Sequence, residues 1–148
     1  MVDVGEKQSL ERVAVATAEV KMTKACVDQV AANNIKKGDV LGTAQLAGVM
    51  AAKRTADLIP MCHPLALDHI EVKCRLEVQT VKIEARVSAR ERTGVEMEAL
   101  MAASVAALTV FDMCKALDPG MVIGPVQVER KTKNGQVSFE RSSGDGQG

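Results

Sequence analysis

The sequence has almost no aromatic residues. Its 148 residues include no Trp, no Tyr and only two Phe, at positions 111 and 139. Modules that bind RNA or single-stranded nucleic acid stack bases on aromatic side chains, so we expect no such module here. The core must instead be built from aliphatic side chains, alanine and methionine, of which there are eight.

An excess of charge is also missing. Lys plus Arg number 19, as do Asp plus Glu, which gives a formal net charge of zero. A general nucleic-acid-binding protein normally has a basic excess, so nucleic acid is not an expected partner. With 47% hydrophobic and 26% charged residues, the composition is that of an ordinary globular domain.

Disulfide and membrane-spanning patterns are absent too. Four cysteines occur, at positions 26, 62, 74 and 114, and none lies at CxxC spacing, which favours a reducing compartment. The N-terminal residues contain no apolar stretch typical of a signal peptide. The longest uncharged helical stretch, residues 99–111, is shorter than the roughly 18 residues that cross a membrane. We therefore expect a cytoplasmic protein without a membrane partner.

The pattern along the chain indicates one domain over residues 1–141, without an internal repeat or a linker. Residues 142–148 are Ser, Gly, Asp and Gln. They have no apolar side chain to bury, so we expect a disordered tail.

Hydrophobic periodicity predicts an α+β fold. Period-two alternation over 67–79 and 81–90 predicts an antiparallel hairpin with one solvated face. Thr93 and Glu96 form a capping box that opens a long helix reaching Leu117. The expected architecture is an antiparallel four-stranded sheet with helices packed on one face, loosely ferredoxin-like. The remaining expected elements are strands over 12–22, 121–130 and 136–140, the last two joined by an Asn134-Gly135 turn, and helices over 24–34 and 40–59, the second capped by Asp39.

Between residues 99 and 111 the long helix is uncharged on nearly all sides. A helix that is apolar on every side must be buried on every side. One sheet covers only one side of it, so we expect the rest to pack against another subunit of an oligomer.

Asp112 and Lys115 follow this apolar stretch and share a helix face at spacing i,i+3. They could form a surface ion pair of little consequence. In a partly dry site they would instead hold each other charged, ready for proton transfer. The spacing alone leaves both interpretations open.

A loop bracketed by prolines contains Met61, Cys62 and His63. His63 is either a surface side chain or a functional one, since such loops commonly contain functional residues. A structural zinc site made by Cys62, His63 and His69 is a further alternative, although the spacing fits no common zinc pattern. Glu98, in the first turn of the long helix, could accept hydrogen bonds from the N–H groups of a guanine-derived ring.

Cationic residues form a third group of candidates. They are either a solvated face, in which Asp57 pairs with Lys53 and Arg54, or a phosphate site. The group consists of Lys36, Lys37, Lys53, Arg54, Arg130 and Lys131.

Six segments are distinctive: KGDV (37–40), AAKRTADLIPMCHPL (51–65), TGVEMEAL (93–100), AASVAAL (102–108), FDMCKA (111–116) and MVIGPV (121–126). In this order they cover most of residues 37–131. Together they resemble the cyclic pyranopterin monophosphate synthase family of molybdenum cofactor biosynthesis.

The resemblance implies an enzyme and its reaction. The family converts a cyclic dihydroguanosine triphosphate (3',8-cyclo-7,8-dihydro-GTP) into cyclic pyranopterin monophosphate and releases pyrophosphate. These steps need proton transfers and neutralisation of phosphate charge rather than a redox centre. The implied partner is a small-molecule substrate. No cofactor is required, although Mg²⁺ could accompany the triphosphate.

Residue roles also follow from the resemblance. Asp112 matches the catalytic aspartate of the family, Lys115 matches the lysine one turn later, and Lys131 matches a lysine near the reacting groups. These three are the catalytic residues that the resemblance implies. The resemblance also implies a hexamer, assembled as a trimer of dimers, with active sites shared between subunits. The substrate-binding residues implied by the match are Lys37, Lys53, Met61, Cys62, His63, Met97 and Glu98.

One segment departs from the family pattern. The family lysine is usually followed by a Gly-Gly-Lys-Ser-Gly loop, whereas here Lys131 precedes Thr132-Lys133-Asn134-Gly135, which predicts a tight hairpin. Lys133 could then substitute for Lys131.

Two other functions stay open beside the synthase: a non-catalytic homo-oligomer that binds a nucleotide or a pterin, and a structural zinc protein. The Asp112–Lys115 pair favours the enzyme, because a module that only binds has no need of both groups.

Overall fold

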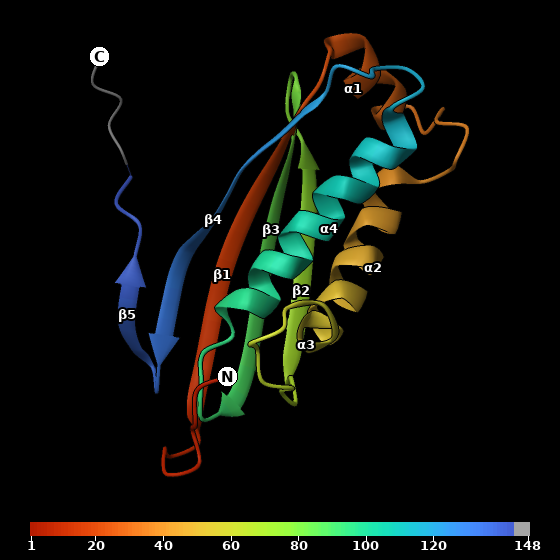
Figure 1. Cartoon of the computed structure of the whole chain (residues 1–148). Helices are drawn as coiled ribbons and strands as arrows, with labels where there is room; N and C mark the ends of the chain where they lie inside the picture. Colours follow the sequence, from red (N-terminus) through yellow and green to blue (C-terminus); the bar gives the residue numbers. More distant parts are fainter. Residues whose placement is uncertain (144–148) are drawn as a thin grey trace.

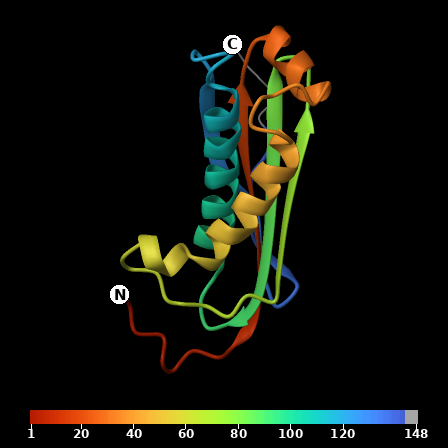
Figure 2. The ribbon, with the colours of Figure 1, turned by 90° about the vertical axis from the view of Figure 1, so that its right-hand side faces the viewer.

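The computed structural model describes residues 1–143, so the predicted tail lies almost entirely outside the described residues. One layer of helices packs on one face of a sheet (Figures 1 and 2). The strands are β1 (Leu10–Lys21), β2 (His69–Leu76), β3 (Thr80–Glu91), β4 (Val122–Lys133) and β5 (Gln136–Glu140), and the helices are α1 (Lys24–Ala31), α2 (Val40–Lys53), α3 (Thr55–Leu58) and α4 (Glu96–Cys114).

The strands pair antiparallel in the order β2-β3-β1-β4-β5. The α+β class is confirmed, but the expected count of four strands is wrong, because the sheet has five. Asn134 and Gly135 have φ angles of 50° and 78°, as a two-residue type I′ turn requires. This turn reverses the chain and adds β5 beside β4. Without β5, the element order and the strand order are those of a ferredoxin-like unit.

Small residues let α2 and α4 approach each other and the sheet closely. Gly48 of α2 lies at the contact: a Cβ atom there would be 2.9 Å from the carbonyl oxygen of Ala102 and 3.1 Å from Cγ2 of Val72. The sheet also presents small side chains, since Ala14, Ala16 and Ala18 of β1 are fully buried. The buried face of α4 is mostly alanine: Ala99, Ala102, Ala103, Ala106 and Ala107.

The helix expected over 40–59 is interrupted. Asp39 does cap α2, with Oδ1 accepting from the Gly42 amide at 3.1 Å. Arg54 then leaves the helical region (φ −112°, ψ 13°), and α3 begins at Thr55. The hydroxyl of Thr55 donates to the carbonyl oxygen of Ala52 at 3.0 Å, a local bond that competes with the regular helical pattern.

The predicted capping box is wrong. Helix α4 begins at Glu96, and its N-cap residue is Val95, whose side chain makes no capping hydrogen bond. Thr93 lies outside the helix, and the carboxylate of Glu96 contacts Lys131 instead. A residue on a neighbouring strand has therefore replaced the local partner that the sequence suggested.

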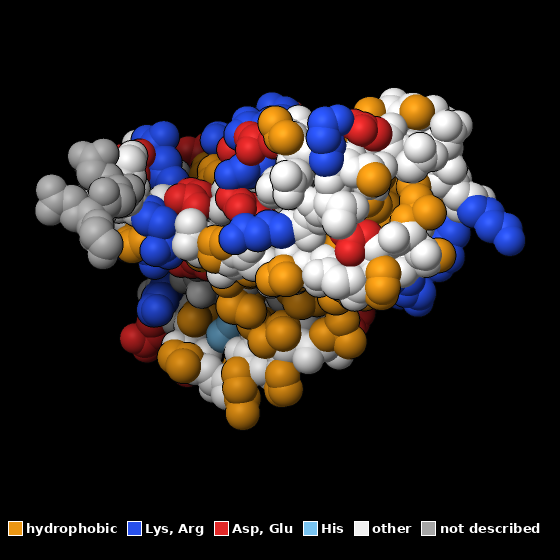
Figure 3. Space-filling view, turned by 90° about the horizontal axis from the view of Figure 1, so that it is seen from above, with side chains coloured by type: hydrophobic (Ala, Val, Ile, Leu, Met, Phe, Trp, Pro, Cys, Tyr) orange, Lys and Arg blue, Asp and Glu red, His pale blue; other side chains and the backbone are white. Residues whose placement is uncertain are grey.

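The helix side of the molecule keeps a large apolar surface in the single chain. In Figure 3, hydrophobic side chains gather on this side, whereas charged side chains gather on the opposite one. By length and composition α4 could cross a membrane, but half of that stretch is buried inside the fold, as in a core helix. The exposed apolar residues of this side are Leu46 (62%), Met50 (48%), Leu58 (65%), Met61 (70%) and Leu108 (57%).

Candidate functional site

Asp112, in the last turn of α4, is bound by two lysines. Its Oδ1 lies 2.8 Å from Nζ of Lys115, so the two residues predicted to share a helix face do contact each other. Its Oδ2 lies 2.7 Å from Nζ of Lys37, which comes from the loop before α2. Lys37 also donates to the backbone carbonyl oxygen of Asp112 at 3.1 Å. We call these three residues the Asp112 cluster.

The hydrogen bonds within this cluster keep the Asp112 carboxylate ionised. Hydrogen bonds from Lys115 and then Lys37 lower the pKa of Asp112 to about 2. The three side chains are half exposed, so their ion pairs add little to stability. The arrangement instead supplies an ionised carboxylate beside two ammonium groups, which can donate protons or bind phosphate.

A cavity of about 160 Å³ lies at the other end of α4, where the loop after α3 meets the first helical turn. We call it the ring cavity. Five predicted residues line it: Met61, Cys62, His63, Met97 and Glu98. Cys62 is not set up as a nucleophile there, because burial and the nearby charge of Glu98 raise the pKa of its thiol.

Glu98 is the most unusual residue of the ring cavity. It is only 4% exposed, and its Oε2 is buried with no hydrogen-bond partner in the described part of the chain. Burial raises the pKa of this carboxyl. An unsatisfied buried carboxyl oxygen costs free energy, so a ligand that donates a hydrogen bond to it would be favoured.

Lys131 belongs to the ring-cavity end of the molecule. Its Nζ lies 2.9 Å from Oε1 of Glu96, which itself lines the ring cavity. Lys131 is therefore not near Asp112 and Lys115, with which the sequence grouped it as a catalytic residue.

Lys53 ends α2, which runs antiparallel to α4, so that it lies at the end of the molecule where α4 begins (Figure 1). Its side chain is exposed. Within residues 1–143, Asp57 forms no ion pair with Lys53 or Arg54, so the expected solvated pairing is not found.

The predicted residues thus form two groups at opposite ends of α4. Glu98 and Asp112 are fourteen positions apart on the helix, which at about 1.5 Å per residue separates them by about 21 Å. A substrate that fills the ring cavity cannot also contact the Asp112 cluster of the same chain. The start of α4 collects Lys53, Met61, Cys62, His63, Met97, Glu98 and Lys131, and its end collects Lys37, Asp112 and Lys115.

Sequence reasoning missed Arg12. This residue lines a small cavity together with Glu96 and Lys131, and its Nε is buried without a hydrogen-bond partner among the described residues. The available indication was a charged residue at a position of β1 whose period-two neighbours, Ala14 and Ala16, are buried.

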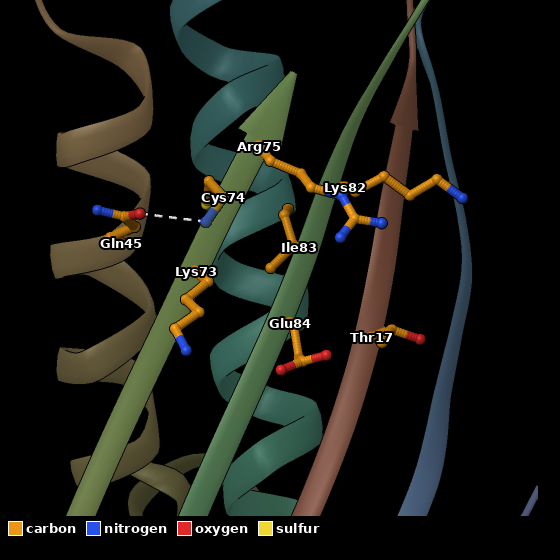
Figure 4. Close-up of a pocket in the computed structure, with 8 residues that line it drawn as sticks. All are labelled: Thr17, Gln45, Lys73, Cys74, Arg75, Lys82, Ile83 and Glu84. Atoms are coloured by element: carbon orange, nitrogen blue, oxygen red, sulfur yellow. Dashed lines mark hydrogen bonds between the residues drawn. The ribbon is translucent and has the colours of Figure 1, made fainter. Parts of the chain in front are cut away.

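A further cavity, of about 370 Å³, lies on the face of the sheet away from the helices (Figure 4). Its three cations, Lys73, Arg75 and Lys82, each contact a glutamate. Gln45 of α2 accepts a hydrogen bond from the Cys74 amide of the edge strand β2 at 3.1 Å. No predicted site residue lines this cavity, so we place the candidate site at the two ends of α4.

The zinc alternative finds no support in the geometry. No group of three His, Cys, Asp or Glu side chains that could hold a metal ion occurs within the described residues. His69 is exposed at the start of β2, and Cys62 and His63 line the ring cavity.

Comparison with known proteins agrees with the six segments. A family model described as the MoaC family matches residues 1–134. A cyclic pyranopterin monophosphate synthase from Roseiflexus sp. (strain RS-1) is 56% identical over 134 residues, which cover 89% of this chain and 85% of the relative. Proteins of the same name from Halalkalibacterium halodurans and Geobacillus kaustophilus are 52% and 50% identical over 147 residues, covering 97% of this chain and 89% and 91% of the relatives. With a family match over nearly its whole length and relatives this similar, the chain belongs to the MoaC family.

Proposed function

We propose that this protein is an enzyme of molybdenum cofactor biosynthesis, a cyclic pyranopterin monophosphate synthase. It converts 3',8-cyclo-7,8-dihydro-GTP into cyclic pyranopterin monophosphate and pyrophosphate, a phosphorus–oxygen lyase reaction. The observation that carries this conclusion is membership of the MoaC family, whose matched relatives have this name. The presence of the complete Asp112 cluster supports this function over that of a non-catalytic nucleotide- or pterin-binding protein.

The ring cavity holds the guanine-derived ring. Glu98 accepts hydrogen bonds from the ring N–H groups, which satisfies the carboxyl oxygen that has no partner among residues 1–143. Met61 and Met97 supply apolar contacts at the same cavity, and His63 lies within reach of the ring for a proton transfer.

The Asp112 cluster performs the acid–base steps. With a pKa near 2, Asp112 stays ionised and holds Lys37 and Lys115 as protonated, oriented donors. When one of these lysines turns to the substrate, Asp112 loses a partner, its pKa rises, and it becomes a better base for the next step.

Lysines at the ring-cavity end neutralise phosphate charge. Lys53 is exposed and free to reach a phosphate, and Lys131 exchanges its contact with Glu96 for one with a phosphate oxygen. These roles use only side chains of the protein, and Mg²⁺ could accompany the triphosphate.

The enzyme works as a homo-oligomer, a hexamer formed as a trimer of dimers, in which two chains share each active site. The separation of about 21 Å along α4 supports this assembly, because a second chain placed antiparallel would bring its Asp112 to the ring cavity of the first. The exposed apolar residues of the helix side support it as well, since isolated chains rarely expose so much apolar surface in one place. The four free cysteines suit a reducing cytoplasm.

Turnover of the cyclised triphosphate tests the function. Pyrophosphate release and the fluorescent oxidised pterin are followed together, and the absence of Trp and Tyr keeps protein fluorescence low. Equal amounts of the two products are expected. A folded protein that releases neither product from verified substrate would contradict the proposal and favour a binding module.

Mixed oligomers test the shared site. Asp112→Ala and Glu98→Ala chains are each expected to be inactive alone. In a two-fold dimer each mixed pair has one intact site, so random mixing restores about a quarter of wild-type activity. Mixtures that stay inactive although the chains exchange would place each complete site within one chain.

A further inference from the structure

The β4–β5 hairpin places Lys133 beside Arg12. In the pairing of β1 with β4, Lys131 is opposite Ala14 and Lys133 is opposite Arg12. Ala14 is buried under the helices, and residues two apart in a strand point to the same face, so Arg12 and Lys133 also point to the helix side. Lys131 already contacts Glu96, the first residue of α4. The next row, Arg12 and Lys133, therefore lies beyond the end of the helix, where Arg12 is beside residues 92–95.

This row opens into a cavity of about 360 Å³ lined by Lys7, Gln8, Leu10, Arg12 and Lys133. Three of these five residues are cations. None of the three forms an ion pair with any residue of the described chain. Cations gathered without a counter-charge repel one another, which favours the binding of an anion.

Arg12 shows that a hydrogen-bond acceptor is missing. Its Nε is buried without a partner among residues 1–143, and its Nη2 reaches only the carbonyl oxygen of Arg92, at 3.4 Å. A group with several acceptor oxygens would satisfy the guanidinium and bridge it to the neighbouring lysines. A polyphosphate has this chemistry, whereas a single carboxylate offers too few oxygens for three cations.

We propose that Lys133 is a specificity-determining residue which, together with Lys7 and Arg12, binds the two phosphates that leave as pyrophosphate. The assignment rests on the proposed function, because it places the distal end of the triphosphate. Arg12 also lines the small cavity with Lys131, so one substrate can extend from the reacting phosphate at Lys131 into this cavity. The tight Asn134-Gly135 turn, with positive φ at both residues, holds Lys133 in the strand.

Calorimetric titration with inorganic pyrophosphate tests the proposal without any turnover. The full-length protein is compared with Lys133→Gln, Lys133→Arg and the matched control Lys21→Gln, which removes an exposed lysine at the opposite end of β1. Lys133→Gln weakens pyrophosphate binding about tenfold, as expected for the loss of one charge-assisted contact. Lys133→Arg stays within about twofold of wild type because it keeps the charge. Lys21→Gln binds as wild type does.

Steady-state kinetics supply a second measurement. Lys133→Gln raises KM for the cyclised triphosphate and leaves kcat unchanged, because the residue binds a group common to ground and transition states. Wild-type protein that fails to bind pyrophosphate at millimolar concentration would overturn the proposal, as would equal binding by wild type and Lys133→Gln. A protein that binds pyrophosphate through Lys133 but forms no pterin product would contradict the proposed function alone.

Discussion

At the scale of single residues, Asp112 combines an exposed position with an unusually low pKa. The Asp112→Asn change removes the charge that orients Lys37 and Lys115 and keeps the side-chain shape. We expect turnover to fall by about a hundredfold or more, the usual loss when an acid–base group is removed. The thermal midpoint stays nearly constant because exposed ion pairs contribute little to stability.

Asp28→Asn is the matched control. Asp28 is also an exposed aspartate on a helix with a lysine partner, Lys24, at 2.9 Å, but it lies outside both groups of site residues. The control is expected to retain full turnover. Equal activity of Asp112→Asn and Asp28→Asn would remove Asp112 from the reaction.

The raised pKa of Glu98 predicts a pH-dependent stability. A carboxyl whose pKa is higher in the folded than in the unfolded protein favours folding below the unfolded pKa, and this contribution is lost as pH rises through the folded pKa. Glu98→Gln has no such titration. Relative to wild type, its thermal midpoint should therefore rise as pH increases from about 4 to about 7. Parallel stability curves for the two proteins would show that Glu98 does not bury a charge.

How far the sequence predicted these residues depended on distance along the chain. The contact of Asp112 with Lys115 spans one helical turn and was predicted from spacing. Lys37 is 75 positions from Asp112, and no local pattern relates them. The same limit explains why Glu96 was assigned to a capping box, when its partner is Lys131 on another strand.

At the scale of elements, the contact of α2 with α4 depends on Gly48. Adding a methyl group there would bring Cβ to 2.9 Å from a backbone oxygen of α4, which cannot yield as a flexible side chain could. We expect Gly48→Ala to lower the free energy of unfolding by about 1–3 kcal/mol, despite the higher helix propensity of alanine. Chemical denaturation measures the change.

Gly120→Ala serves as the control for this prediction. A Cβ at Gly120 would meet its nearest neighbour, Oδ1 of Asp118, at 3.6 Å, which is an ordinary contact. Its stability should match wild type within about 0.5 kcal/mol. A Gly48→Ala variant as stable as this control would mean that the two helices separate at little cost.

Elements with local patterns were predicted well. Alternation identified β2 and β3, and Asn134-Gly135 identified the final hairpin. The break of the second helix at Arg54 was not predicted, because it depends on hydrogen bonding by Thr55 rather than on proline or glycine. The expected sheet of four strands left out one of the five strands that the patterns themselves indicated, and β5 joins the sheet by pairing with β4 across the Asn134-Gly135 turn.

At the scale of the whole molecule, the apolar surface on the helix side predicts assembly. Leu108, on α4, is 57% exposed in the single chain and belongs to that surface. Leu108→Glu would bury a charge in a subunit contact, so we expect smaller particles in analytical ultracentrifugation and a loss of turnover. Val78→Glu changes an apolar residue that is 71% exposed at the β2–β3 turn and should affect neither.

A wild-type protein that sediments as a monomer with full turnover would contradict both the assembly and the shared site. A Leu108→Glu protein that keeps its assembly would move the subunit contact to another face. The uncharged stretch at 99–111 led to the expectation of a subunit contact, which stays a prediction, and no local pattern could show that the site residues divide between the two ends of α4.

Both halves of the site are attached to one uninterrupted helix, α4, whose length sets the distance between them. In the proposed dimer, each complete site would lie between the start of one such helix and the end of the other. The length of α4 would therefore set the position of the two halves in every site. One residue inserted near the middle of α4 would turn one end by about 100° and advance it by about 1.5 Å relative to the other. Every recognisable motif would survive in such a sequence, yet the groups that must meet would no longer face each other.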